Sequence, residues 1–445
     1  MERTVGHSAR RTLGAVAVLA MVATACLGNN SSSTGPQSSG PSVKPITPKE
    51  PTSPVTLTFS SWVGESPQMK KFAEEFHSLH PNITIDFQNV SADNSTTKLT
   101  TQIAGGTAPD VAFMDASAVE QFASRDALVN LDGYIAGSKT VNLSDYVPGF
   151  LQTAQYQGST YAMPFDGETT GIFYRTDMFK AAGISSPPTT WDEFQADAAK
   201  LTDTAKKQYG FIEFGPESEY YWEPFLWEAG GHLMSQDGKT ITFDSPEGIK
   251  AANFYVGLRK YSPPDYYSSN SWDGRVAFAT GKVAMYEAGA WFGGQMKTEF
   301  PKIDGKWSVA PMPTGPAGCA TTIAGDSLAV FSQSKYPDAA WMWIEFLTQP
   351  DNMKTWTFGS PTTTLLPPRQ SLLSDPELGK YNPWLEGFAQ QMKCAVNDNL
   401  TNPKWPQISD ALNTELGKAI FGEQSASEAI QKAAQKGQQI LAGNG

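Results

Sequence analysis

Residues 160–175, TYAMPFDGETTGIFYR, place two carboxylates, Asp166 and Glu168, between a proline and an apolar, aromatic run that is typical of a buried strand. Acidic groups beside a buried strand lose solvation free energy unless a partner occupies their acceptor atoms. That partner can be the local backbone, a reacting glycosidic bond or a bound molecule. The three alternatives correspond to a structural, an enzymatic and a binding role.

The segments before this stretch follow a strand–helix rhythm. VTLTFSSW (55–62), ITIDFQNV (83–90) and DVAFMD (110–115) read as strands, and helical patterns separate them. This order predicts an α/β fold with a parallel sheet flanked by helices. Ligands of such sheets bind beyond the carboxyl ends of the strands. Three polar or aromatic residues lie at those ends: Trp62, Glu65 and Asp115.

Length and charge restrict the protein class. A chain of 445 residues exceeds one ordinary hydrophobic core, so two domains or lobes are expected. The net charge of −12 repels phosphate backbones and disfavours nucleic-acid binding. The sequence contains neither HExxH nor a Cys/His cluster nor a complete phosphate-binding loop, so we predict no catalytic metal and no cofactor.

The N-terminus predicts export and anchoring. Residues 1–25 combine arginines with a short apolar run, which is typical of a signal peptide. VATAC resembles a bacterial lipobox, so Cys26 is the expected lipidation site; the alternative is an ordinary signal peptide cut near Ala25. Arg10-Arg11 leaves twin-arginine export open beside the general route. Residues 26–54, rich in Ser, Pro and Gly, predict a disordered tether, which places the protein on the extracytoplasmic face of the cell membrane.

Two cysteines remain after Cys26. An exported protein meets an oxidising environment, so Cys319 and Cys394 are expected to form a disulfide; the alternative is two separate buried thiols. The bond would close a loop of roughly 75 residues, which loop-entropy arguments equate with about 4 kcal/mol.

Six segments, taken in order, carry a resemblance to a known family. The chain resembles the extracellular solute-binding lipoproteins of ABC importers, in the branch that binds sugars, over nearly all of residues 55–420. The six segments are GGTAPDVAFMD, YAMPFDGETTGIFYRTDMF, PPTTWDEF, FATGKVAMYEAGAW, AGDSLAVFSQSKYPDAAWMWIEFLT and PTTTLLPPRQSLL.

The resemblance implies a periplasmic-binding-protein-like fold. Two discontinuous α/β lobes would be joined by crossover strands and would hold the ligand in a cleft between them. Residues 160–175 would form the first crossover. One lobe would comprise residues 55–164 and 320–358, and the other residues 165–319 and 359–445.

The resemblance also implies a ligand site. For several of its residues, the sequence is also compatible with a purely structural role. Asp166 and Glu168 would accept bonds from sugar hydroxyls, or would cap backbone and form surface salt bridges. Asp115 would either bind ligand or cap a helix. Glu65 would either bind ligand or place its negative charge favourably just before a helix N-terminus. Trp222 would either be a second stacking surface for the sugar or belong to the core of its lobe. Many relatives carry Gly-Trp where this chain has Gly325-Asp326. The predicted ligand-binding residues are Trp62, Glu65, Asp115, Asp166, Glu168, Trp222, Trp291 (a stacking tryptophan), Gly325, Asp326 and Arg369 (a donor to ligand oxygens or a cleft carboxylate).

The predicted function is that of a monomeric substrate-binding subunit that delivers a neutral mono- to trisaccharide to an ABC permease, without catalysis. The competing hypothesis is an exported glycoside hydrolase, because paired carboxylates and aromatic platforms also serve that chemistry. The ordered binding-protein motifs and the lack of a (β/α)₈ rhythm oppose the hydrolase.

Overall fold

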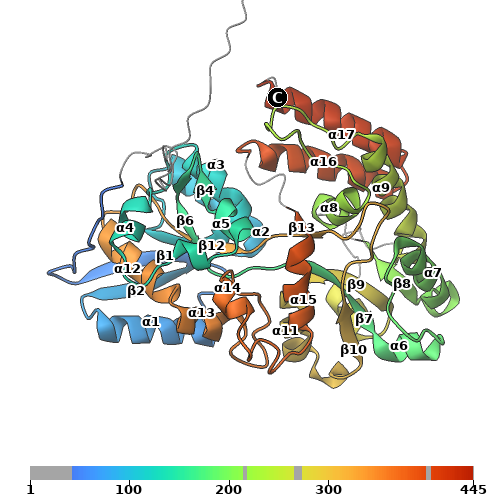
Figure 1. The fold of residues 1–445 in the computed structure, drawn as a ribbon, viewed down its shortest axis with the longest axis horizontal. Helices are drawn as coiled ribbons and strands as arrows, with labels where there is room; N and C mark the ends of the chain where they lie inside the picture. The colour runs from blue at the N-terminus through green and yellow to red at the C-terminus, as the bar shows by residue number, and fades with distance from the viewer. Residues whose placement is uncertain (1–42, 214–217, 265–272, 397–401, 444–445) are drawn as a thin grey trace, which may run out of the picture. The chain divides into compact units, whose positions relative to one another are not determined.

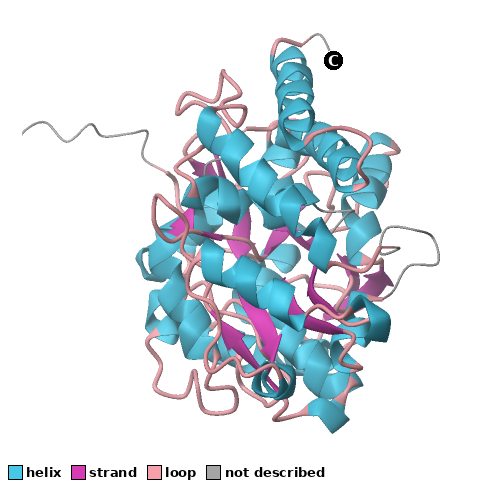
Figure 2. Ribbon diagram, turned by 90° about the vertical axis from the view of Figure 1, so that its right-hand side faces the viewer, coloured by secondary structure: helices cyan, strands magenta, loops and turns pink. Residues whose placement is uncertain are grey.

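The computed structural model describes residues 43–213, 218–264, 273–396 and 402–443 (Figure 1). The predicted signal peptide, Cys26 and the first part of the tether lie outside these residues. Strands lie on the inside of the folded body and helices cover them (Figure 2). Across the described ranges, no helix combines the length and the apolar character that a membrane crossing requires.

The first sheet contains the three strands that the sequence predicts. Its strand order is β2-β1-β3-β12-β6. Strands β1 (Val55–Ser61), β2 (Ile83–Asn89) and β3 (Val111–Asp115) are parallel, and β1 pairs with both neighbours. Strands β12 (Asp326–Val330) and β6 (Ala162–Pro164) extend the sheet in antiparallel pairing. Asp326 therefore begins its strand at the edge where β1, β2 and β3 end.

Local capping explains where the first helix begins. In α1 (Pro67–Leu79), the Ser66 hydroxyl accepts from the Met69 N–H at 3.2 Å, and proline occupies the first turn. Phe72 and Phe76 are fully buried against the first sheet. Leu79 is 65% exposed, because it is the last residue of the helix, where the chain leaves the core.

The second sheet has the order β10-β7-β9-β8. Its strands are β7 (Thr170–Arg175), β8 (Tyr209–Ile212), β9 (Val283–Gly289) and β10 (Trp307–Ala310). Strand β7 is antiparallel to both β9 and β10, while β8 runs parallel to β9. This sheet and its helices form the second lobe, so the predicted α/β two-lobe fold is confirmed.

The remaining elements cover the sheets or connect them. The helices are α2 (Ala92–Ala104), α3 (Val119–Ala123), α4 (Asp132–Gly137), α5 (Pro148–Thr153), α6 (Thr176–Ala181), α7 (Trp191–Leu201), α8 (Ser218–Glu228), α9 (Pro246–Gly257), α10 (Gly274–Ala279), α11 (Trp291–Glu299), α12 (Pro337–Leu347), α13 (Pro350–Thr357), α14 (Gln370–Leu373), α15 (Leu385–Gln391), α16 (Trp405–Ile420) and α17 (Ala426–Leu441). The short strands are β4 (Gln155–Tyr156), β5 (Ser159–Thr160), β11 (Thr321–Thr322) and β13 (Ala395–Val396).

Three distant segments meet where the chain passes from one sheet to the other. Residues 165–169 connect β6 to β7, and residues 311–325 connect β10 to β12. Gly167 exchanges backbone hydrogen bonds with Leu366 at 2.7 and 2.9 Å, and Glu168 exchanges them with Ala324 at 2.8 and 3.2 Å. The segment that carries the two carboxylates is thus bonded on both sides. We call these three segments, residues 165–169, 311–325 and 358–368, the crossovers.

The described end of the predicted tether contacts the folded body. Ile46 N–H donates to Gly133 O at 2.8 Å, and Lys49 N–H donates to Asp338 Oδ2 at 3.1 Å. Pro51 O accepts from the Asn82 amide at 2.8 Å. Residues 46–51 are therefore attached to the first lobe, whereas the predicted tether boundary at residue 54 stays a prediction.

The structure contains the disulfide that the sequence predicts. Cys319 and Cys394 are bonded, with their Cα atoms 5.7 Å apart. The adjacent short strands β11 and β13 pair in parallel. The disulfide therefore ties the second crossover to the chain that leads into the C-terminal helices.

Candidate functional site

Acidic residues from separate strands meet at one edge of the first sheet. Asp115 ends β3 and lies opposite Asp326, the first residue of β12, in the sheet register. Asp166 follows β6, and its carboxylate accepts from the Asp326 N–H at 3.1 Å. The fold thus brings these three predicted site residues together, because the antiparallel β12 begins at the edge of the sheet where β3 and β6 end.

Asp166 answers the question that residues 160–175 raise. Its side chain is only 2% exposed. One carboxylate oxygen accepts from the Asp326 backbone, and the other accepts from Trp356 Nε1 at 2.7 Å. Its partners are therefore protein groups at the start of β12 and on α13. In this structure the side chain is buried and each carboxylate oxygen accepts a hydrogen bond from the protein, so contact of Asp166 with ligand stays a prediction.

Burial and neighbouring negative charges together determine the pKa values of Asp166 and Asp326. Burial raises the pKa of Asp166 to about 6, although hydrogen bonds from Trp356 and Asp326 lower it. Burial also raises the pKa of Asp326, and the negative charges of Asp166, Asp115 and Glu168 raise it further. Asp326 itself is partly exposed, so it can still present an oxygen to a ligand.

Glu168 and Trp291 pack side by side over Gly289, the last residue of β9. A Cβ atom at Gly289 would lie 2.1 Å from Glu168 Oε2 and 2.7 Å from Trp291 Nε1. The Tyr220 hydroxyl, on α8, donates to Glu168 Oε1 at 3.0 Å. Burial raises the pKa of Tyr220, and the charges of Glu168 and Asp115 add to this effect. Side chains from the first crossover, α8 and α11 thus meet in one place, and the charge of Asp115 on the first sheet acts on them.

Two further candidates lie at the ends of the parallel strands. Trp62 follows β1, is partly exposed, and packs its ring edgewise against Phe113 with 4.7 Å between the ring centroids. Glu65 is exposed and forms an ion pair with Lys70, and it also accepts from Asn89 at 2.8 Å. The Lys70 hydrogen bond lowers the pKa of Glu65. Its two partners lie on α1 and β2, away from the acids around Asp326, so the ligand role of Glu65 stays a prediction.

Trp222 belongs to the core of the second lobe. Its side chain is 0% exposed, and its ring meets Phe243 edgewise with 6.3 Å between centroids. The α8 surface that carries Trp222 faces the hydrophobic core, whereas Tyr220, two residues earlier, reaches Glu168. Of the two alternatives for Trp222, its packing is that of lobe core, and a ligand platform there stays a prediction; Tyr220 occupies the position beside Glu168.

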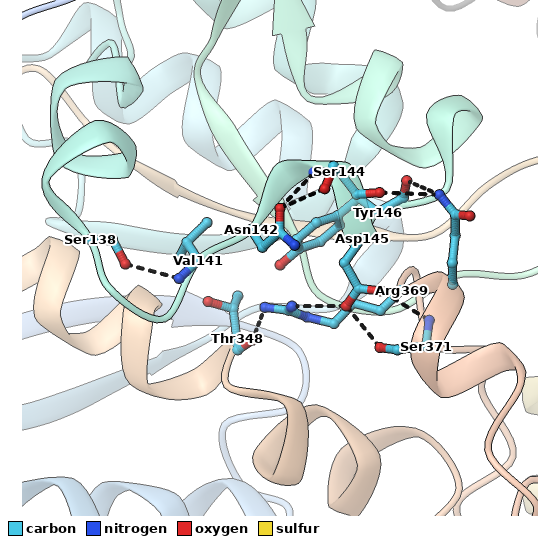
Figure 3. A network of polar contacts seen from close by, with 10 residues as sticks. Ser138, Val141, Asn142, Ser144, Asp145, Tyr146, Thr348, Arg369 and Ser371 are labelled. Carbon is cyan, nitrogen blue, oxygen red and sulfur yellow. Dashed lines mark hydrogen bonds and ion pairs between the residues drawn. The ribbon is translucent and has the colours of Figure 1, made fainter.

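Arg369 lies in a buried polar network rather than beside those acids (Figure 3). It is 2% exposed, donates to Asp145 Oδ2 at 3.1 Å and to Thr348 O at 2.8 Å, and lies 4.8 Å from the Tyr146 ring centroid. Burial acts to raise the pKa of Asp145, but hydrogen bonds from Ser371 and Arg369 lower it overall. Its guanidinium fixes the start of α14 to the first lobe, and contact of Arg369 with ligand stays a prediction.

Gly325 allows two crossovers to touch. It adopts a φ of +150°, and a Cβ atom there would lie 2.5 Å from Asp166 O and 2.7 Å from Gly167 Cα. Only a residue without a side chain fits between two backbones at this distance. Gly325, which the sequence predicts to bind ligand, is thus needed for the close packing of the first and second crossovers.

We expect Gly325→Ala to lower the free energy of unfolding by about 2 kcal/mol or more, because the methyl group forces two backbones apart at a strained φ. Urea denaturation measures the change. Gly318→Ala is the matched control, since Gly318 has a φ of +132° with open space around it. Equal losses in the two variants would show that backbone strain, and not the close approach, determines the effect.

Sequence reasoning did not place Trp356 or Tyr220 among the site residues. Tyr220 stands in SEYYWEPF, whose density of aromatic residues was a usable signal. Trp356 gave no signal, because its partner Asp166 is 190 residues away in the chain. Within the ranges that the structure describes, no group of three His, Cys, Asp or Glu residues is arranged to hold a metal ion.

Comparison with known proteins gives consistent matches. Residues 61–354 match the family described as bacterial extracellular solute-binding protein. A putative binding protein of Brucella abortus is 28% identical over 395 residues, which cover 87% of this chain and 93% of the relative. A solute-binding protein from Thermotoga lettingae, solved with α-D-tagatose, has a TM-score of 0.79 at 28% identity and covers 88% of this chain and 100% of its own. The GacH receptor of Streptomyces glaucescens, solved with and without acarbose, has a TM-score of 0.78 at 26% identity, with coverage of 87% and 98%.

Proposed function

The chain belongs to the bacterial extracellular solute-binding proteins, and we propose that it is the sugar-binding subunit of an ABC importer. The observation that carries this proposal is the packing of the Glu168 carboxylate against the Trp291 indole over Gly289, with Tyr220 bonded to the acid. Related structures contain α-D-tagatose and acarbose, which supports a carbohydrate as the ligand class.

The chemistry of this place fits a neutral sugar. An ionised carboxylate accepts hydrogen bonds from hydroxyl groups, and bonds to a charged acceptor are the stronger kind. A flat indole matches the apolar C–H face of a pyranose. Asp115, Asp326 and Glu168 lie close together, so a phosphorylated or acidic sugar would be repelled. We propose a mono- to trisaccharide, contacted by Glu168, Trp291, Asp115, Asp326 and Trp62.

The fold suggests how binding is used. Two lobes joined by crossovers can open and close by hinge bending, and a ligand that contacts both lobes favours the closed form. We propose that the closed form delivers its sugar to a membrane permease. We further propose that the protein acts as a monomer anchored through lipidated Cys26 on the extracytoplasmic face of the membrane.

The hydrolase alternative predicts two carboxyl groups open to a glycosidic bond. Asp166 is buried with both oxygens occupied, which disfavours its pairing with Glu168 in catalysis. Incubating the protein with labelled maltotriose separates the two functions. Saturable binding of unchanged maltotriose supports the binding protein, whereas release of shorter sugars would establish the enzyme.

We expect Trp291→Ala to weaken sugar binding by at least about 30-fold, which corresponds to the roughly 2 kcal/mol of a binding hot spot. Thermal-shift screening against D-tagatose, maltose, maltotriose and acarbose selects the sugar, and calorimetry gives its affinity. Tyr336→Ala is the control, because this 40% exposed ring lies beyond the opposite end of β12. Unchanged affinity in Trp291→Ala would exclude the indole from the site.

A further inference from the structure

The Glu168 carboxylate is held on one side by a phenol. The Tyr220 hydroxyl donates to Glu168 Oε1 at 3.0 Å, while Oε2 lies on the side of Gly289 and Trp291. Because a phenolic hydroxyl carries a single proton, the bond to the carboxylate uses the only donor of Tyr220. One oxygen of Glu168 is therefore fixed by α8, and the other is kept on the side of the indole.

A buried threonine holds the phenol in turn. Thr322, on β11, is 2% exposed, and its hydroxyl lies 3.3 Å from the Tyr220 hydroxyl. Since the Tyr220 proton is donated to Glu168, the proton of this contact comes from Thr322. The other acceptor of Thr322, Thr170 Oγ1, is farther away, at 3.5 Å. Thr322, Tyr220 and Glu168 thus form a chain of hydrogen bonds in which each donor points toward the carboxylate.

Thr322 is itself firmly placed, because its strand is bonded on several sides. The Thr321 hydroxyl accepts from the Thr170 N–H and donates to Thr170 O, both at 3.0 Å. Both residues of β11 pair with β13, and the disulfide between Cys319 and Cys394 ties the preceding chain to the same place. The chain of hydrogen bonds therefore begins at a fixed point of the second crossover.

We propose that Tyr220 and Thr322 are positioning residues that hold the Glu168 carboxylate in its binding geometry and so set the affinity for the sugar. The inference rests on the proposed function, in which this carboxylate accepts a hydrogen bond from a sugar hydroxyl. Ala324 exchanges backbone hydrogen bonds with Glu168 at 2.8 and 3.2 Å, so the second crossover fixes the backbone of this acid as well as its side chain. A carboxylate that is already held in place loses little side-chain entropy on binding, which raises affinity.

The first test needs no sugar. In protein labelled with ¹³C at the glutamate carboxyl carbon, the Glu168 signal, assigned with Glu168→Gln, reports the hydrogen bond that this group accepts. We expect Tyr220→Phe to shift the signal, because phenylalanine keeps the ring and removes the donor. Thr322→Val should shift it less and in the same direction, because the donor bond that supports the phenol is lost. Thr322→Ser keeps the hydroxyl and should leave the signal in place.

Thr202→Val is the matched control. The Thr202 hydroxyl donates to a carbonyl of α7 at 2.7 Å and accepts from the Gly210 N–H at 3.0 Å, near the start of β8. Strand β8 runs parallel to β9, whose far end lies beside Glu168, so this variant should leave the Glu168 signal unchanged. An unshifted signal in Thr322→Val would overturn the role of this threonine, and an unshifted signal in Tyr220→Phe would overturn the positioning of the acid.

The second test measures binding of D-tagatose, maltose, maltotriose and acarbose by calorimetry. For a sugar that binds, we expect Tyr220→Phe to weaken affinity roughly tenfold and Thr322→Val roughly threefold, while Thr322→Ser keeps the wild-type value. Adding Thr322→Val to Tyr220→Phe should weaken binding no further, because the phenol through which Thr322 acts no longer donates. Unchanged affinity in Tyr220→Phe, or a full additional loss in the double variant, would overturn the inference.

Failure of the sugar proposal gives a different result, because none of these sugars then binds to the wild type. The carboxyl signal of the ligand-free protein decides the positioning of Glu168 in that case. Shifts in both Tyr220→Phe and Thr322→Val support it, and unchanged signals reject it.

Discussion

Replacing Arg369 by methionine is expected to lower the free energy of unfolding by about 3–5 kcal/mol, because it leaves a buried ionic partner unpaired. Asp145, whose side chain is 19% exposed, would lose its ion pair, and the carbonyl of fully buried Thr348 would lose its donor. Urea denaturation measures the loss. The sugar affinity of the folded variant is expected to stay within about threefold of wild type, since Arg369 contacts none of the proposed ligand groups in the structure.

Arg369→Lys is the matched variant. Lysine keeps the charge but is a single-point donor, so it cannot bond Asp145 and Thr348 O while lying flat on the Tyr146 ring. We expect Arg369→Lys to lower the free energy of unfolding by less than the methionine variant does. If methionine left stability intact but abolished sugar binding, the guanidinium would be a ligand group, as the sequence first suggested.

Removing the disulfide with the double variant Cys319→Ser and Cys394→Ser is expected to cost about 4 kcal/mol, because the bond spans 75 residues and restricts the unfolded chain. Urea denaturation with and without a reductant measures the difference. Reductant should destabilise the wild type to the level of the double variant and leave the double variant unchanged. Equal stability of oxidised wild type and double variant would contradict the loop-entropy argument.

The sequence alone determined the features that depend on local patterns. Alternating and continuous apolar runs predicted β1, β2 and β3, because such a signal acts within a few residues. The ordered motifs predicted the family and the two-lobe fold, and the redox context predicted the cysteine pair. The resemblance also singled out Trp291, which lies two residues beyond β9 as the first residue of α11, and its contact with ligand stays a prediction.

Only the tertiary structure decided which polar residues face a ligand and which hold the protein together. Asp166 and Arg369 looked like ligand groups, but their partners Trp356 and Asp145 lie 190 and 224 residues away in the chain. A local pattern states that a buried charge needs a partner, but it does not state which distant segment supplies one. Packing made that choice, and it left Glu168 and Trp291 beside each other at the place that we propose for the sugar.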